Sequence, residues 1–248
     1  MKKQPSLDEL IEITKEILRA KYPSAEFAFL SGSIIRGEGT PFSDLDIVVI
    51  FKKLPNSFRE SFYFQDLPIE TFVHTPETLN YFFESDARRG VPSLAAMVAE
   101  GIEVPHKSDL SEKLKRLANE VLKNPPNLTA EQTTNLRYHI TNLVDDIRAP
   151  RSKEELTASA TELYAVLAEF YLRANGFWAA RNKSIPRMLR KTNPEFGVVF
   201  GESFEELFVC GKPEKVIQMA ETVLEKSGGF ASENLRFDAS ADWQKPIE

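Results

Sequence analysis

The chain of 248 residues has little of several features that mark whole classes of protein. Its single cysteine, Cys210, excludes an internal disulfide, and the apolar setting ELFVCG predicts a small core residue. No apolar stretch approaches the roughly 18 residues that a membrane-spanning helix needs, and MKKQPSLDEL has no signal-peptide pattern. We therefore expect a cytoplasmic protein with no membrane segment.

Two common nucleotide-binding motifs and a histidine metal site are also missing. Gly32, Gly37 and Gly39 follow an apolar run, but their spacing is not the G-x-G-x-x-G of a dinucleotide site. No G-K-S or G-K-T follows them, as a Walker loop requires. The three histidines, His74, His106 and His139, have no metal-ligand spacing. Any phosphate site here must be of another kind.

An excess of basic charge is absent too. Lys and Arg number 31 against 37 Asp and Glu, so the formal net charge is −6. A polyanion is attracted by clustered positive charge, so this balance disfavours nucleic acid as a partner. The apolar content of 42% is that of an ordinary globular protein.

The most informative stretch is 27–51, FAFLSGSIIRGEGTPFSDLDIVVIF. Asp44 and Asp46 are two residues apart, so on an extended backbone both side chains leave the same face and can share divalent cations. Gly32 allows the backbone to approach a bulky anion, and the Ser33 hydroxyl and the amides after it can donate to phosphate oxygens. The pattern predicts a site for a nucleoside triphosphate and magnesium, whereas an isolated Asp-x-Asp would merely begin a strand.

A third oxygen ligand is expected because magnesium prefers octahedral oxygen coordination. Glu70 lies in the predicted strand LPIETFV, among apolar neighbours. A charge there is costly unless it is paired or bound to metal. On an edge strand Glu70 would simply face solvent. Asp66 is the competing candidate, but it lies two residues before Pro68 and is typical of a loop.

These residues resemble the signature of the nucleotidyltransferase superfamily, which includes DNA polymerase β and the antibiotic adenylyltransferases. The resemblance covers 24–106, and Arg36-Gly37 and Ser43-Asp44 are similar to pairs in its small bacterial members. It implies transfer of a nucleoside monophosphate, AMP from ATP, to a hydroxyl with loss of pyrophosphate and dependence on two Mg²⁺ ions. The implied catalytic and metal-binding residues are Asp44, Asp46 and Glu70, and the implied nucleotide contacts are Gly32, Ser33 and Arg36.

The predicted organisation is an α/β domain followed by an all-helical one. Strands at 26–31, 45–51 and 67–73 predict a small mixed sheet in a catalytic domain, 1–107, with 58–64 as an aromatic connection. Capping boxes and apolar periodicity predict helices throughout 108–230. Pro125-Pro126 is interpreted as a turn inside the helical half, and 231–248 as a polar tail.

The helical half resembles, in architecture only, the second domain of aminoglycoside- and lincosamide-type adenylyltransferases, where it helps to form the acceptor pocket. By that resemblance Lys183 contacts the triphosphate, with Arg181 and Arg187 behind it. Candidate groups to bind a cationic acceptor or take its proton are Asp145, Asp146 and Glu169. A solvated face explains all of these residues as well.

We expect a nucleoside triphosphate and a small-molecule acceptor as partners. Two other functions stay open: a non-catalytic nucleotide-binding or antitoxin-like regulatory protein, and a transferase that acts on protein or tRNA. The acceptor, the base of the nucleotide and the oligomeric state are also open, since a fold does not determine them.

Overall fold

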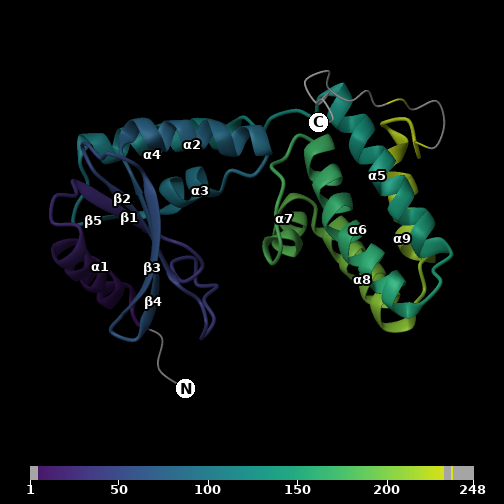
Figure 1. Ribbon diagram of the computed structural model, residues 1–248, viewed down its shortest axis with the longest axis horizontal. Helices are drawn as coiled ribbons and strands as arrows, with labels where there is room; N and C mark the ends of the chain where they lie inside the picture. The colour runs from purple at the N-terminus through teal and green to yellow at the C-terminus, as the bar shows by residue number, and fades with distance from the viewer. Residues whose placement is uncertain (1–4, 232–235, 237–248) are drawn as a thin grey trace, which may run out of the picture. The chain divides into compact units, whose positions relative to one another are not determined.

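The computed structural model describes residues 5–231 and residue 236, and its chain divides into two compact units between Pro126 and Asn127 (Figure 1). Each unit has its own hydrophobic core. The polar tail predicted at 231–248 lies outside the described residues, apart from Ala231 and Arg236.

Unit 1 is built on a mixed sheet, as predicted. The strands lie in the order β3-β4-β2-β1-β5, with β2 and β4 parallel and the other neighbours antiparallel. The strand bounds are β1 Phe27–Ser31, β2 Leu45–Ile50, β3 Phe58–Phe64, β4 Leu67–His74 and β5 Ile102–Val104. The helix bounds are α1 Leu7–Lys21, α2 Pro76–Arg89, α3 Ser93–Glu100 and α4 Asp109–Lys123.

Helices cover both faces of this sheet (Figure 1). Because side chains alternate along a strand, β2 sends Ile47 and Val49 to the face packed by α1, and Val48 and Ile50 to the face packed by α2, α3 and α4. We call these the α1 face and the α2–α4 face. Asp46 precedes Val48 by two residues and therefore lies on the α2–α4 face.

The segment 58–64, predicted as a connection, is instead the edge strand β3. It pairs antiparallel with β4 from Phe58↔Val73 to Phe64↔Leu67. The hairpin turn consists of Gln65 and Asp66, with φ of 49° and 63°. Such turns usually contain Gly or Asn, so the sequence has no strong turn signal here. With β3 outside it, β4 is an interior strand, and Glu70 is not on an edge.

The boundary predicted near Lys107 is wrong by one helix. Helix α4 packs its Leu114 and Ala118 into the core that α2 and α3 form on the sheet. It therefore belongs to unit 1. Pro125-Pro126 lies where the units divide, and not at a turn inside the helical half. An amphipathic helix shows that it has a core-facing stripe, but not which core receives it.

Unit 2 is helical, as predicted. Its helices are α5 Ala130–Arg148, α6 Lys153–Ala174, α7 Ser184–Thr192, α8 Pro194–Cys210 and α9 Glu214–Glu225. Their core includes Leu163, Phe170 and Phe200. Cys210, predicted as a core residue, is exposed at the end of α8. Within the described part of the chain, no helix has the length and apolar character needed to cross a membrane.

Candidate metal centre

A row of polar side chains crosses the α2–α4 face of the sheet. Ser31 of β1 pairs with Asp46 of β2, Asp46 pairs with Glu70 of β4, and Glu70 pairs with Ser61 of β3. Neighbouring strands lie about 4.8 Å apart, so the backbone itself brings the Asp46 and Glu70 side chains together. We call these four residues the polar row.

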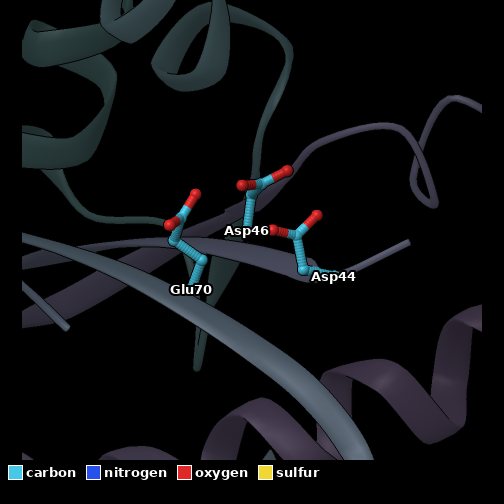
Figure 2. Close-up of side chains that lie close together, drawn as sticks. All are labelled: Asp44, Asp46 and Glu70. Atoms are coloured by element: carbon cyan, nitrogen blue, oxygen red, sulfur yellow. The ribbon is translucent and has the colours of Figure 1, made fainter. Parts of the chain in front are cut away.

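Asp44 joins the polar row from the residue just before β2. One carboxylate oxygen each from Asp44, Asp46 and Glu70 lies within 4.8 Å of the others, and all three residues are half-buried. Figure 2 shows the three side chains rising from the same side of the strands toward a common space. Clustered carboxylates repel one another unless cations or protons are bound, and carboxylate oxygens are the ligands that Mg²⁺ prefers. The donor set therefore fits the predicted divalent metal.

Ser31 adds a second observation at the same place. Its Oγ is buried and has no hydrogen-bond partner among the described residues. A buried hydroxyl without a hydrogen-bond partner is less stable than one that is hydrogen-bonded to water. Because Ser31 pairs with Asp46 in the sheet, this atom lies beside the carboxylate cluster, where a bound ligand or water can satisfy it.

Gly32 allows the chain to turn away from β1 directly against Asp46. Its φ is +92°, a backbone conformation that favours glycine. A Cβ on this residue would lie 2.8 Å from Cγ of Asp46 and would overlap its Oδ2. The group that Gly32 approaches here is the Asp46 carboxylate. The predicted approach of its backbone to a phosphate stays a prediction.

The loop between Gly32 and Asp44 is closed by hydroxyl hydrogen bonds. The Ser33 hydroxyl donates to Oγ of Ser43 over 3.3 Å, and the Thr40 amide donates to the same oxygen over 2.9 Å. The Glu38 amide donates to the Ser33 carbonyl over 2.9 Å. These bonds hold Ser33 beside Ser43, the residue that precedes Asp44, so the predicted phosphate contact belongs to the loop that leads into the carboxylate cluster.

Arg36, the third predicted nucleotide contact, extends from this loop. Its Nε donates to Glu38 over 3.0 Å, and its Nη1 donates to Glu100 of α3 over 3.3 Å. Arg36 would therefore exchange two carboxylate partners for phosphate in order to bind nucleotide.

Glu70 has two partners that sequence reasoning missed, both on β3. Arg59 donates from Nε to Oε1 of Glu70 over 2.6 Å, and the Ser61 hydroxyl donates to the same oxygen over 3.3 Å. The Arg59 guanidinium also lies over the Phe72 ring, 5.2 Å from its centroid. The alternation of Phe58, Phe62 and Phe64 with polar residues was the signal that could have revealed this strand.

The remaining candidates belong to unit 2. Lys183 is exposed at the start of α7. Glu169 forms ion pairs with Arg173 at 3.7 Å and with Arg181 at 3.3 Å. Asp145 accepts from Arg148 over 2.9 Å, and Asp146 accepts from Ser159 over 3.3 Å. Each acidic candidate thus has a partner inside unit 2. The functional roles suggested for these residues stay predictions, as does that of Arg187.

This chain is similar to a protein-family model and to a solved structure. No curated protein matches the chain. Among solved structures, the chain is similar to a nucleotidyltransferase-like protein from Exiguobacterium sibiricum, with 15% sequence identity and a TM-score of 0.46 over 88% of this chain and 75% of that one. The model of the nucleotidyltransferase domain family matches residues 11–90. The segment that carries Gly32, Asp44, Asp46 and Glu70 therefore matches the nucleotidyltransferase domain family.

Proposed function

We propose that unit 1 is a nucleotidyltransferase catalytic domain that moves a nucleoside monophosphate, AMP from ATP, to a hydroxyl of a small acceptor. The observation that carries the proposal is the convergence of Asp44, Asp46 and Glu70 within 4.8 Å, beside a glycine turn that lies against Asp46. The family match over 11–90 supports the reaction class.

Each residue of the site has a separate role in the proposed reaction. The three carboxylates would hold two Mg²⁺ ions, which when bound neutralise charge on the α-phosphate and lower the pKa of the acceptor hydroxyl. Gly32 lets the chain turn against Asp46, and the Ser33 hydroxyl would donate to the β- and γ-phosphates. The acceptor oxygen forms a bond to the α-phosphorus while the bond to pyrophosphate breaks, so its electron pair leaves with pyrophosphate. The hydroxyl proton passes to Glu70.

A small acceptor is favoured over a nucleic acid by the formal net charge of −6. The resemblance to two-domain antibiotic adenylyltransferases points to the same class of acceptor. The contact of Lys183 with the triphosphate stays a prediction.

The test compares two Asp→Asn variants of the full chain. Asp46→Asn removes a charge from the carboxylate cluster. Asp66→Asn is the matched control, because it makes the same change in the β3–β4 turn, where Asn tolerates the φ of 63°. The measurements are Mn²⁺ binding by electron paramagnetic resonance and pyrophosphate release from ATP, with water and with a panel of hydroxylated small molecules as acceptors.

We expect Asp46→Asn to lower pyrophosphate release at least about 100-fold, since even outer partners of a metal ligand are worth roughly 10–100-fold. Asp66→Asn should resemble the unmodified chain. Equal activity in the two variants would remove Asp46 from the site. Mg²⁺-dependent ATP binding without pyrophosphate release under any condition would instead favour a non-catalytic nucleotide-binding protein.

A further inference from the structure

A pocket of about 480 Å³ lies on the α2–α4 face of unit 1. Its sheet side is formed by Arg59, Phe72 and His74, and its helix side includes Phe82 of α2 and Met97 of α3. This volume is typical of sites that bind small molecules. We call it the Phe72 pocket.

The Phe72 pocket lies on the same face of the sheet as the carboxylate cluster and is joined to it through Arg59. Glu70 and Phe72 are alternate residues of β4, so their side chains leave the same face about 7 Å apart along the strand. Arg59 connects them, because its guanidinium lies over the Phe72 ring and its Nε donates to Glu70. The wall of the pocket is therefore bonded to a metal-site carboxylate.

The order of the strands decides which part of a reaction this pocket serves. Across the sheet, Gly32 follows β1, Asp46 lies on β2, Glu70 on β4 and Arg59 on β3. In an in-line displacement the incoming oxygen approaches opposite the departing one. With pyrophosphate departing over the Gly32 turn, the incoming hydroxyl lies on the side of β4 and β3, where the Phe72 pocket is located.

The lining indicates what kind of molecule fits. Its apolar side chains are Phe58, Phe72, Phe82, Leu94 and Met97. Burial lowers the pKa of His74 to about 4, so its imidazole is uncharged at neutral pH.

Charged groups in the lining are unfavourable to a cation. The acidic residue in the lining is Asp86, which is buried. Its carboxylate accepts a hydrogen bond from the Leu94 amide over 2.9 Å and forms an ion pair with Arg89. The Arg59 and Arg89 side chains are 63% and 66% exposed. A polycationic acceptor in this pocket would therefore meet two guanidinium groups, and the carboxylate of the lining, that of Asp86, is already paired.

We propose that the Phe72 pocket is the acceptor subsite and that it takes a flat, ring-bearing hydroxyl compound, neutral or anionic, whose hydroxyl is placed beside Glu70. This rests on the proposed function, in which that hydroxyl attacks the α-phosphorus and pyrophosphate leaves. Aromatic rings bind well between such side chains because they stack on faces and edges. Polycationic aminoglycosides are not acceptors under this proposal.

The test measures binding to the full chain of 2-naphthol, 6-hydroxy-2-naphthoate and kanamycin, by isothermal titration calorimetry. Phe82→Ala removes a ring from the pocket wall. Tyr81→Ala is the matched control, since Tyr81 is the adjacent ring, is 59% exposed and does not line the pocket. Ser93→Trp fills the pocket from an exposed lining position without removing core packing.

We expect both naphthalene compounds to bind the unmodified chain and Tyr81→Ala alike. The affinity should fall roughly fivefold or more in Phe82→Ala, the effect of losing one aromatic contact, and also in Ser93→Trp. Kanamycin should not bind. Equal affinity in all variants, no binding of either naphthalene compound, or binding of kanamycin alone would overturn the assignment.

A second measurement separates an acceptor from a nucleobase in the same pocket. With Mg²⁺ and α,β-methylene ATP present, an acceptor subsite retains its affinity for the naphthalene compounds, whereas a nucleobase subsite loses it by competition. Loss would overturn the proposal.

Failure of the proposed function has a different signature. If Mn²⁺ does not bind and pyrophosphate is not released, while the naphthalene compounds still distinguish Phe82→Ala from Tyr81→Ala, the acceptor role falls although the pocket binds rings. If metal binding and turnover hold and no ring compound binds, the inference about the Phe72 pocket alone is wrong.

Discussion

Replacing Arg59 with Met should tighten metal binding at the carboxylate cluster. The Arg59 guanidinium donates to Oε1 of Glu70, so a divalent cation that binds this oxygen must displace it. Met keeps an apolar chain over the Phe72 ring but removes both the charge and the hydrogen bond. The variant therefore measures how strongly a side-chain cation competes with the metal.

The magnitude follows from exposure. The Glu70 side chain is 13% exposed and that of Arg59 is 63% exposed. Fully exposed ion pairs are worth about 0.2–1 kcal/mol, and hydrogen bonds to charged groups about 1.5–3 kcal/mol. The Arg59–Glu70 pair is exposed on one side only, so its free energy should lie where these two ranges approach each other, at about 1 kcal/mol. Since 1.4 kcal/mol is tenfold in an equilibrium constant, the dissociation constant should fall roughly fivefold.

The assay is titration with Mn²⁺, followed through the resonance of the free ion. Arg116→Met is the control, because Arg116 on α4 is 69% exposed, pairs with Glu112 at 3.7 Å and carries the same charge. We expect it to change the dissociation constant by less than about twofold, since Arg116 is exposed and has no bond to the three carboxylates, and exposed charges interact weakly through water. Unchanged or weaker Mn²⁺ binding in Arg59→Met would refute the competition between guanidinium and metal.

Two further predictions concern the turn beside the site and the buried histidine. Gly32→Ala and Gly37→Ala both place alanine at positive φ, which alone should cost about 1 kcal/mol of stability in urea unfolding, and Gly32→Ala should lose more because its Cβ also overlaps Asp46. Only at Gly32 does the new Cβ overlap Asp46, so Mn²⁺ binding should weaken more than about tenfold there and stay unchanged at Gly37, where the Cβ meets nothing within 4 Å; equal binding in both variants would contradict the close approach. Burial lowers the pKa of His74 from 6.5 to about 4, so between these pH values only the unfolded chain takes up the proton and the free energy of unfolding falls as the pH drops from about 6.5 to 4. In His74→Gln the difference in urea midpoint between pH 7 and pH 5 should be smaller than in the unmodified chain. The control is His106→Gln, which replaces an exposed histidine and should behave like the unmodified chain. A pH difference of the same size in all three proteins would show that His74 is not the group responsible.

The carboxylate cluster was predictable because strand geometry is local. Two aspartates at spacing two on an extended chain must share a face, and a glycine at a strand end marks a sharp turn. Glu70 was harder, since its assignment depended on β4 being interior. The parallel pairing with Asp46 that makes it a neighbour is a long-range contact, and a single sequence contains no direct record of it.

The errors have equally specific causes. Strand β3 was missed because Gln65 and Asp66 form a tight turn without Gly or Asn, so Arg59 and Ser61 were never considered as partners of Glu70. Helix α4 was assigned to the wrong unit because its apolar stripe fits any core of suitable shape. In both cases the deciding interaction joins segments distant in sequence.

The pairing of Asp46 with Glu70 also makes the site a reporter of folding. A slip of one residue between β2 and β4 would turn Glu70 to the opposite face of the sheet, because side chains alternate along a strand. The complete ligand set then exists only after these strands have joined in the native register. Time-resolved Mn²⁺ uptake during refolding would therefore report correct assembly of the sheet. A compact chain with β2 and β4 out of register would take up no Mn²⁺ in the same experiment.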